Sequence, residues 1–340
     1  MNKVYLNFAI NQMTSLRYFI PLVIEGNKRN IQSRFFVREC GKYNCALQHI
    51  KKLVKLAEEY KFLIFPLKEL INYPKEPTFF TEDQCLYESS MIPNKKYVIT
   101  TMTDFISLHN KPRVPQPNPW YPGAYVNYCD HVIMLSEFVA EYYNCLSPKN
   151  LYFGSPKYDV ELNEEEIYKK YDLKKHERYV LLAFPRIRDF RKMDLKKLYV
   201  FLRDLGYKII VKTRAKDRVP YRELMGDHYF EDASWYPHTT MELIKISNFI
   251  VNFSSTTIKE CVLLKRPLIN FHTKPFDIPM GFLYNLDYCK NLNVELNFDE
   301  IKEAVNYLET TDLSEQYDVA IKEFLFEPKN VSKKILDFAL

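Results

Sequence analysis

Short apolar runs that alternate with segments of helical periodicity are the feature that most constrains the fold of this sequence. The runs are rich in β-branched and aromatic residues, which predicts buried strands. The segments between them repeat apolar residues at helical spacing, which predicts helices. The predicted strands cover residues 4–10, 34–37, 62–67, 97–102, 131–136, 179–184, 207–213, 249–253 and 267–271. Strands separated by helices in this way indicate parallel sheets in an α/β fold.

A break in this pattern divides the chain into two series. A short strand that starts at Leu151 stops at Gly154 and Pro156, and a charged helical segment follows before strands and helices begin again. A chain of 340 residues is long enough for two domains, each with its own core. We therefore predict two Rossmann-like domains, residues 1–160 and residues 161–340.

The composition excludes several classes of protein. With 47% apolar and 15% aromatic residues and only seven glycines, the chain is globular rather than disordered or collagen-like. Its seven cysteines include no C-x-x-C pair, which argues against a disulfide framework and against a zinc site. No apolar run approaches the ~18 residues of a membrane-spanning helix, and the first residues lack the pattern of a signal peptide. We therefore expect reduced thiols and a cytoplasmic location.

The net charge of +5 is modest for this length. It is not gathered in a block that could follow a nucleic-acid backbone, so we expect no nucleic-acid partner. Residues 1–160 hold 19 Lys and Arg against 14 Asp and Glu, an excess that would suit peripheral contact with an anionic membrane or a phosphorylated acceptor. An ordinary solvated surface explains the same excess.

Four consecutive hydroxyl residues, Ser254, Ser255, Thr256 and Thr257, lie between a predicted strand and a predicted helix. We expect Ser254 or Ser255 to begin the helix, where one side-chain oxygen is enough to cap it. Hydroxyls at the carboxyl end of a parallel strand also suit an anion, because free backbone N–H groups and the positive end of the helix favour a phosphate.

Two pairs of basic residues follow neighbouring strands of the second predicted domain. Arg186 and Arg188 come after the strand at 179–184, and Lys212 and Arg214 alternate at the end of the next strand. A guanidinium forms forked bonds with phosphate oxygens and stays charged at any working pH. A charge cluster is usually a solvated face, but these pairs end at the same edge of the predicted sheet as the hydroxyl cluster. We therefore predict that they bind a diphosphate.

A loop at residues 233–238 places Trp235 and His238 before a helix that we expect Thr239 or Thr240 to cap. An aromatic loop in this position would stack on or enclose a nucleobase. Packing of the same side chains in the core is the alternative.

Several of these segments resemble one family of enzymes. N-F-S-S-T-T-I-K-E followed by K-R-P-L-I-N-F is similar to the nucleotide-binding half of GT-B glycosyltransferases, and above all to the group with CDP-glycerol glycerophosphotransferases, capsule-forming transferases and UDP-N-acetylglucosamine 2-epimerases. F-G-S-P-K-Y-D at 153–159 resembles the G-x-P-x-x-D element that ends their first domain, and residues 129–143 and 207–217 resemble two of their strand segments. The sequence departs from the family at Arg214-Ala215, where the family has His-Pro, and at residues 11–18, which replace a glycine-rich turn.

The resemblance implies a GT-B architecture with an interdomain cleft, an acceptor domain at 1–160 and a nucleotide-donor domain at 161–340. It also implies that Glu260 binds the ribose hydroxyls, a role suited to an ionised acceptor of two hydrogen bonds. A carboxylate on the surface of a helix is the alternative for Glu260.

Asp104 and His109 follow a strand of the first predicted domain. An inverting transferase needs a carboxylate or an imidazole that takes the proton of the acceptor hydroxyl, and either residue would serve. The alternatives are a helix cap for Asp104 and an ordinary loop position for His109.

These residues together predict a transferase that moves a glycosyl or glycerophosphate group from a nucleotide-activated donor, such as a nucleotide sugar or a CDP-glycerol-like molecule, to a glycan or lipid-linked acceptor. The chain contains no D-x-D motif, so we expect a metal-independent enzyme that needs no cofactor beyond its donor substrate. A non-hydrolysing UDP-sugar 2-epimerase and a non-catalytic nucleotide-sugar binding protein are the alternatives.

Overall fold

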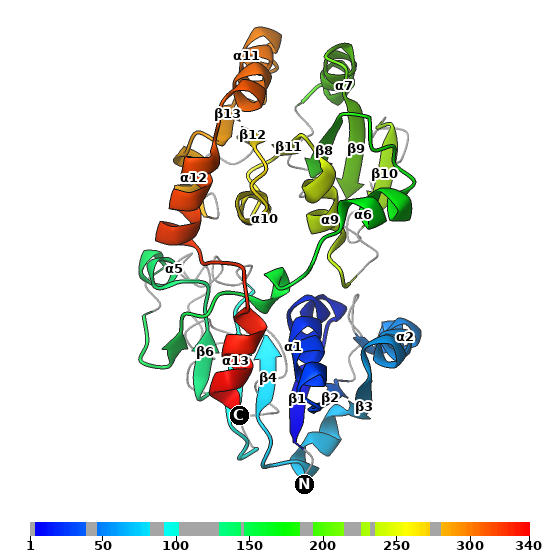
Figure 1. Ribbon diagram of the computed structural model, residues 1–340, viewed down its shortest axis with the longest axis vertical. Coiled ribbons are helices and arrows are strands. Elements are labelled where there is room, and N and C mark those ends of the chain that lie inside the picture. Colours follow the sequence, from blue (N-terminus) through cyan, green and yellow to red (C-terminus); the bar gives the residue numbers. More distant parts are fainter. Residues whose placement is uncertain are drawn as a thin grey trace, which may run out of the picture. The chain divides into compact units, whose positions relative to one another are not determined.

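The computed structural model describes residues 4–38, 46–81, 92–101, 129–143, 146–183, 193–213, 226–231, 235–272 and 280–340. The chain divides into two compact units (Figure 1). Unit 1 comprises Met1–Val160 together with Phe324–Leu340, and unit 2 comprises Glu161–Glu323. The C-terminal segment, which the sequence analysis placed in the second domain, thus packs with unit 1.

Unit 1 is built on a parallel sheet with the strand order β3-β2-β1-β4-β5-β6-β7. Its strands are β1 (Tyr5–Ile10), β2 (Gln32–Val37), β3 (Phe62–Pro66), β4 (Thr78–Thr81), β5 (Lys96–Ile99), β6 (His131–Ile133) and β7 (Asn150–Leu151). Its helices and helical turns are η1 (Met13–Ser15), α1 (Leu16–Lys28), η2 (Ala46–His49), α2 (Ile50–Tyr60), η3 (Leu67–Asn72), α5 (Glu137–Tyr142), η5 (Pro156–Tyr158) and α13 (Val331–Ala339). β4 was not predicted from the sequence, because its four residues are too few to show a periodicity.

A row of rings crosses five neighbouring strands of this sheet. Phe8 pairs in register with Phe35 and Phe79, Phe79 pairs with Tyr97, and Tyr97 pairs with His131. Neighbouring ring centroids lie 5.0 to 5.4 Å apart, and the rings are stacked. Each such pair contributes about 0.5–1.5 kcal/mol beyond the area that it buries. We call these five residues the aromatic row.

Unit 2 is built on a second parallel sheet with the strand order β10-β9-β8-β11-β12-β13. Its strands are β8 (Tyr179–Ala183), β9 (Lys208–Thr213), β10 (His228–Glu231), β11 (Phe249–Asn252), β12 (Leu268–Phe271) and β13 (Cys289–Leu292). Its helices and helical turns are α6 (Glu164–Tyr171), α7 (Leu195–Asp204), α9 (Thr239–Ile246), α10 (Ile258–Leu263), η7 (Gly281–Asn285), α11 (Phe298–Thr310), α12 (Ser314–Val319) and the π-helical turn η8 (Ala320–Phe324), which ends in unit 1.

The two sheets share one strand order. In each unit the first strand lies between the second and the fourth, so that β1 separates β2 from β4 and β8 separates β9 from β11. This is the order of Rossmann-like domains, in which the strand order reverses beside the first strand. The predicted α/β class with two Rossmann-like domains is confirmed.

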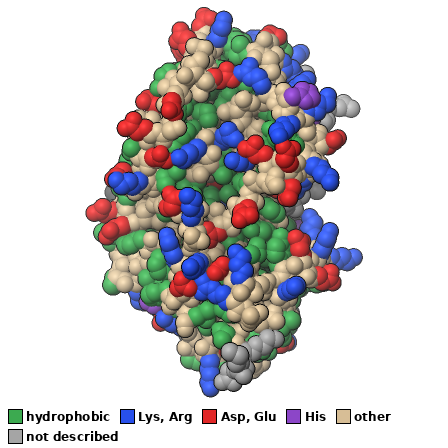
Figure 2. All heavy atoms as spheres, in the orientation of Figure 1, with side chains coloured by type: hydrophobic (Ala, Val, Ile, Leu, Met, Phe, Trp, Pro, Cys, Tyr) green, Lys and Arg blue, Asp and Glu red, His purple; other side chains and the backbone are tan. Residues whose placement is uncertain are grey.

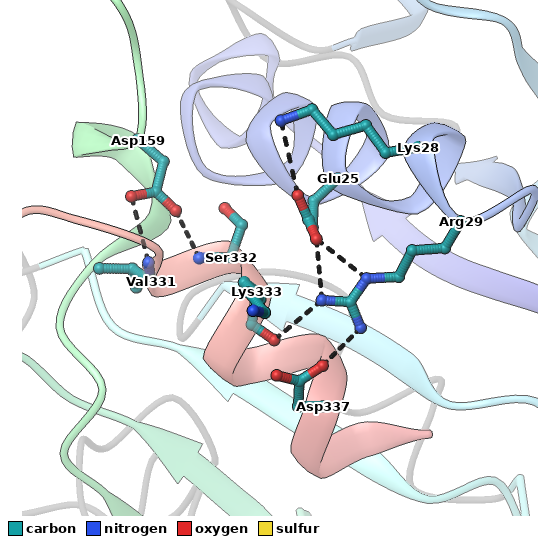
Figure 3. Close-up of polar contacts among 8 residues, drawn as sticks. All are labelled: Glu25, Lys28, Arg29, Asp159, Val331, Ser332, Lys333 and Asp337. Atoms are coloured by element: carbon teal, nitrogen blue, oxygen red, sulfur yellow. Dashed lines mark hydrogen bonds and ion pairs between the residues drawn. The ribbon is translucent and has the colours of Figure 1, made fainter.

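The C-terminal segment is attached to unit 1 at the F-G-S-P-K-Y-D motif. Gly154 has a φ of +91°, and a Cβ atom there would lie 2.2 Å from the ring of Phe326, so a glycine is required. The Asp159 carboxylate accepts hydrogen bonds from the backbone N–H groups of Val331 and Ser332, where α13 begins (Figure 3). The motif that the sequence analysis singled out is therefore the place where the last helix docks.

Arg29 on α1 forms a second attachment for α13. Its guanidinium lies between Glu25 of the same helix, at 2.8 Å, and Asp337 of α13, at 2.6 Å, and it also donates to the Lys333 carbonyl (Figure 3). Because these ion pairs are partly exposed, they contribute little to stability and serve mainly to orient α13.

Candidate functional site

The hydroxyl cluster lies where the strand order of the second sheet reverses. β8 and β11 are neighbours, although the first connects outward to β9 and the second to β12. In open α/β sheets, ligands bind outside the carboxyl ends of the strands at such a switch point. Ser254 follows β11 by two positions, so residues Ser254–Thr257, which we call the Ser254 turn, leave the sheet there.

The Ser254 turn has a defined backbone conformation. Ser254 has a φ of +49°, in the left-handed region, and its N–H donates to Asn270 Oδ1 at 2.8 Å. Ser255 Oγ accepts from the Thr257 N–H at 3.4 Å and lies 3.1 Å from Thr257 Oγ1. The side chain of Ser254 is fully buried, whereas Ser255 and Thr256 are partly exposed. The exposed hydroxyls are therefore the ones that a ligand can reach.

The expectation that Ser254 or Ser255 begins the helix is wrong. α10 begins at Ile258, Thr257 holds the N-cap position, and the Thr257 side chain makes no capping bond. Ser254 is held in a left-handed conformation by its hydrogen bond to Asn270 and lies in the turn that precedes α10. α10 has six residues, so we attribute any affinity for anions to the turn itself.

Three asparagines line the carboxyl ends of β11, β12 and β13. Asn252 pairs in register with Asn270, and Asn270 pairs with Asn291. Asn252 Nδ2 donates to Asn270 Oδ1 at 3.1 Å, and Asn270 Nδ2 donates to Asn291 Oδ1 at 3.0 Å. Asn252 and Asn270 are fully buried. We call these residues the asparagine row.

Tyr284 of η7 connects the asparagine row to the Ser254 turn. Its hydroxyl accepts from Asn252 Nδ2 at 2.8 Å and donates to the Ser255 carbonyl at 2.6 Å. Burial raises the pKa of Tyr284 well above its ordinary value, so the hydroxyl keeps the proton that it donates.

Lys212 lies on the same row of the sheet, two strands from Asn252. Lys212 pairs in register with Ala183 of β8. Because the preceding residue of β8, Leu182, pairs with Val251 of β11, Asn252 lies beside Ala183. With strands about 4.8 Å apart, the backbones of Lys212 and Asn252 are roughly 10 Å from each other. Lys212 is buried within β9, near the carboxyl end of that strand.

Glu260 lies in the first turn of α10 and is 6% exposed. The alternative of a carboxylate on a helix surface is therefore wrong. A buried carboxylate costs free energy unless it is paired, so Glu260 is held for a structural or a functional reason.

Trp235 and His238 are both buried, at 7% and 8% exposure. His238 holds the N-cap position of α9 without a side-chain capping bond, and the helix begins at Thr239. The expectation that Thr239 or Thr240 caps this helix is wrong, because both threonines lie inside it. Whether the two buried aromatic residues contact a nucleobase stays a prediction.

The remaining candidate residues lie outside the part of the chain that the structure describes. They are Asp104, His109, Arg186, Arg188 and Arg214. Arg186 and Arg188 follow β8 in the sequence, and Arg214 follows β9 directly. Their assignment as phosphate ligands or catalytic groups stays a prediction.

The asparagine row and Tyr284 were not predicted from the sequence. The signal was an asparagine followed by an apolar residue in three neighbouring segments: Asn252-Phe253, Asn270-Phe271 and Asn291-Leu292. The rings of Phe253 and Phe271 stack on each other at 6.0 Å. The alternation shows its meaning only when the segments are known to be adjacent parallel strands, because side chains alternate between the two faces of a sheet.

Two buried cysteines lie near this network. Cys261 is on α10, and Cys289 Sγ donates to Asn291 Oδ1 at 3.7 Å. Burial raises the pKa of both thiols, so neither forms a reactive thiolate at neutral pH. These two cysteines are structural.

The residues that the structure describes bear on two further properties, metal binding and membrane insertion. No group of three or more His, Cys, Asp or Glu side chains in this part of the chain is arranged to hold a metal ion. Within the same residues, no helix has the length and the apolar character needed to cross a membrane. Figure 2 shows basic and acidic side chains interspersed over the face in view.

No protein-family model and no curated protein matches the sequence. Solved structures match its fold. The wall teichoic acid polymerase TagF with CDPG has a TM-score of 0.66 and 15% identity, with 99% of this chain and 88% of that chain covered. The UDP-GlcNAc 2-epimerase of Neisseria meningitidis bound to UDP-GlcNAc has a TM-score of 0.65 and 13% identity, with 99% of both chains covered. The glycotransferase of kitacinnamycin has a TM-score of 0.63 and 9% identity, with 100% of both chains covered.

Identities this low establish the fold alone. The chain has the GT-B fold, with its two Rossmann-like domains, and its structural neighbours include glycosyltransferases, a wall teichoic acid polymerase and a UDP-GlcNAc 2-epimerase. The resemblance drawn from the sequence motifs is confirmed at this level.

Proposed function

We propose that the chain is a transferase that moves a glycosyl or glycerophosphate group from a nucleotide-activated donor to a glycan or lipid-linked acceptor. The observation that carries the proposal is the Ser254 turn, which stands at the switch point of a sheet in a fold shared by glycosyltransferases over the whole chain. The structural neighbours of the chain include proteins solved with UDP-GlcNAc and with CDPG, which supports a donor that carries a nucleotide.

Unit 2 is proposed to bind the donor. The partly exposed Ser255 and Thr256 would hydrogen-bond the diphosphate, and Lys212 would neutralise the negative charge that develops on the departing group. Glu260 would accept hydrogen bonds from the two ribose hydroxyls. Arg186, Arg188 and Arg214 are proposed to add forked bonds to the phosphates, because guanidinium groups match phosphate oxygens in geometry and charge.

Unit 1 is proposed to bind the acceptor. In the transfer step the acceptor oxygen forms a bond to the transferred group, the bond from that group to the donor phosphate breaks, and the nucleotide leaves with both bonding electrons. The acceptor proton passes to a base, for which Asp104 and His109 are the proposed candidates. In the absence of an acceptor, the donor should therefore bind but react only slowly.

A UDP-sugar 2-epimerase is the second candidate function. The TM-score against the Neisseria meningitidis epimerase, 0.65, is nearly that against TagF, 0.66. The two functions share a donor site and differ in product, since an epimerase returns the nucleotide sugar with its 2-substituent inverted. A binding protein would return the donor unchanged.

A thermal-shift screen against UDP, GDP, CDP, CMP and ADP conjugates tests the proposal. A ligand that binds only the folded state raises the melting temperature, and the rise grows with affinity. We expect one base to give the largest shift. The conjugate that binds is then incubated with the protein, and the products separate transfer or hydrolysis, epimerisation and binding alone. The proposal fails if none of the conjugates shifts the melting temperature.

The variant Glu260→Gln tests the proposed contact with the ribose. It keeps the shape of the side chain but replaces one acceptor oxygen with a donor, so affinity should fall by about ten-fold or more. Glu242→Gln is the matched control, because Glu242 is equally buried in unit 2 and binds Lys170 and Tyr171. The wild type and the Glu242 variant should bind a 2′,3′-dideoxy donor more weakly than the ribose donor. The Glu260 variant should bind the two donors almost equally. If all three proteins discriminate equally between the ribose and the dideoxyribose donors, Glu260 does not contact the ribose.

A further inference from the structure

The Ser254 turn is held by side chains from two other elements. The Ser254 N–H donates to Asn270 of β12 at 2.8 Å, and the Ser255 carbonyl accepts from the Tyr284 hydroxyl of η7 at 2.6 Å. Asn270 is fully buried and Tyr284 is 2% exposed. Two consecutive residues of the turn are thus fixed by buried polar partners.

Asn252 links these two partners and sets the direction of their hydrogen bonds. Its Nδ2 group, which only donates, bonds to Asn270 Oδ1 at 3.1 Å and to the Tyr284 hydroxyl at 2.8 Å. The Tyr284 oxygen therefore accepts from Asn252, and its single proton is directed to the Ser255 carbonyl. The network has one consistent set of donors and acceptors, which favours one conformation of the turn.

The conformation that the network favours is one that serine rarely adopts. Ser254 has a φ of +49°, and a residue with a Cβ atom in the left-handed region is less stable than in a right-handed one. Without its partners the turn would relax toward other backbone conformations. Its partly exposed members, Ser255 and Thr256, would then lose their fixed direction.

We infer that Asn270 and Tyr284 are positioning residues for the donor. They hold the Ser254 turn in the conformation that presents the N–H and hydroxyl groups of Ser255 and Thr256 to the donor phosphates. A site that is already ordered loses less entropy when the ligand binds, so the network raises affinity without contacting the ligand. The inference rests on the proposed function, because it takes the turn as part of the donor site.

The variant Tyr284→Phe tests the inference, because it keeps the ring and removes only the hydroxyl. Ser247→Ala is the matched control, since it removes another buried hydroxyl of unit 2, one that donates to the Leu243 carbonyl at 2.7 Å. Isothermal titration with UDP, CDP and inorganic pyrophosphate gives the affinities. We expect the Tyr284 variant to lose about ten-fold or more in affinity for each probe that binds the wild type, and the Ser247 variant to stay within about two-fold.

Hydrogen exchange of the amides in residues 254–257 gives a second readout, which needs no ligand. We expect faster exchange there in Tyr284→Phe than in Ser247→Ala, after correction for the global stability of each variant. If the wild type binds no probe, the proposed function fails, and the hold on the turn is judged by exchange alone. Equal affinities and equal exchange in the Tyr284 and Ser247 variants would overturn the inference.

Discussion

The aromatic row of unit 1 and the asparagine row of unit 2 are built on sheets with the same strand order but have opposite chemistry. The first stacks Phe35, Phe8, Phe79, Tyr97 and His131 across five strands, and almost all of this contact is apolar. The second joins Asn252, Asn270 and Asn291 by hydrogen bonds across three strands.

The difference shows what each row can specify. Stacked rings contribute stability but tolerate small changes of backbone direction, because dispersion depends weakly on angle. Hydrogen bonds between buried amides are directional, and a missing partner costs free energy, so they select one backbone conformation for the turn that they reach. Positions where a buried sheet departs from its apolar pattern are therefore where function is to be sought.

The largest expected effect is the loss of the central ring of the aromatic row. Phe8→Ala should destabilise unit 1 by about 3–5 kcal/mol, because Phe8 is fully buried and stacks on Phe35 and Phe79. Hydrogen exchange of unit 1 peptides measures the change without assuming that the two units unfold together. Phe8→Leu, which keeps most of the volume, should cost less than about 1.5 kcal/mol. Equal costs for the two variants would contradict this expectation and show that the lost ring stacking, rather than the cavity, sets the cost.

The next effect separates two members of the asparagine row. Asn270→Leu removes the acceptor of the buried Ser254 N–H and should destabilise unit 2 by about 1–3 kcal/mol. Asn252→Leu removes two hydrogen bonds but should cost less than Asn270→Leu, because Asn270 Oδ1 and the Tyr284 hydroxyl each keep another partner, and because Asn252 Oδ1 is buried without a partner among the described residues. Exchange of unit 2 peptides measures both. A larger cost for the Asn252 variant would contradict this account of the row.

Much of the fold could be predicted from the sequence, and the reason is visible in the strands. β1, β2, β8 and β9 are buried runs rich in apolar residues, and such runs are typical of parallel strands. β13 was missed because it is an edge strand that exposes Asn291, so its sequence carries no apolar run. The attachment of α13 to unit 1 was missed because an amphipathic pattern does not say which core its apolar face meets.

The candidate site could be predicted in its location but not in its geometry. The hydroxyl cluster and Glu260 pointed to the end of β11, and the structure describes a turn and a buried carboxylate there. The start of α10 was misplaced because serine favours both a helix cap and a turn, and only the hydrogen bond to Asn270 selects the left-handed conformation of Ser254. That partner lies on a different strand, so the local sequence cannot reveal it.

A smaller effect is expected at Ser254 itself. Ser254→Gly and Ser254→Ala both remove the hydroxyl, but only glycine adopts a φ of +49° without strain. The glycine variant should therefore be more stable than the alanine variant by about 1–2 kcal/mol. Chemical denaturation of both variants measures the difference. Because the Ser254 side chain is fully buried, the glycine variant should also keep its affinity for the donor within about two-fold. Equal stabilities would mean that the turn relaxes in the alanine variant, and the asparagine row would then not fix it.

The smallest effect is expected at His131, the titratable member of the aromatic row. Burial lowers its pKa below the ordinary 6.5, Lys95 and Lys149 lower it further, and Asp130 opposes them. The folded protein therefore binds this proton less readily than the unfolded chain does. The stabilising contribution of the neutral imidazole is present above pH 6.5 and is lost as the pH falls from there to the pKa of the folded state, below which it stays constant.

Unfolding by urea across this pH range, followed through unit 1 peptides, measures the loss at His131. His131→Phe keeps a ring beside Tyr97 and Phe338 and cannot titrate, so it serves as the control. The stability of the wild type relative to this variant should decrease as the solution is acidified below pH 6.5, whereas carboxylates that titrate lower affect both proteins alike. A difference that does not change with pH would show that the protonated imidazole is as well accommodated in the row as the neutral one. The aromatic row would then accommodate a charged group, and the contrast between the two sheets would not extend to electrostatics.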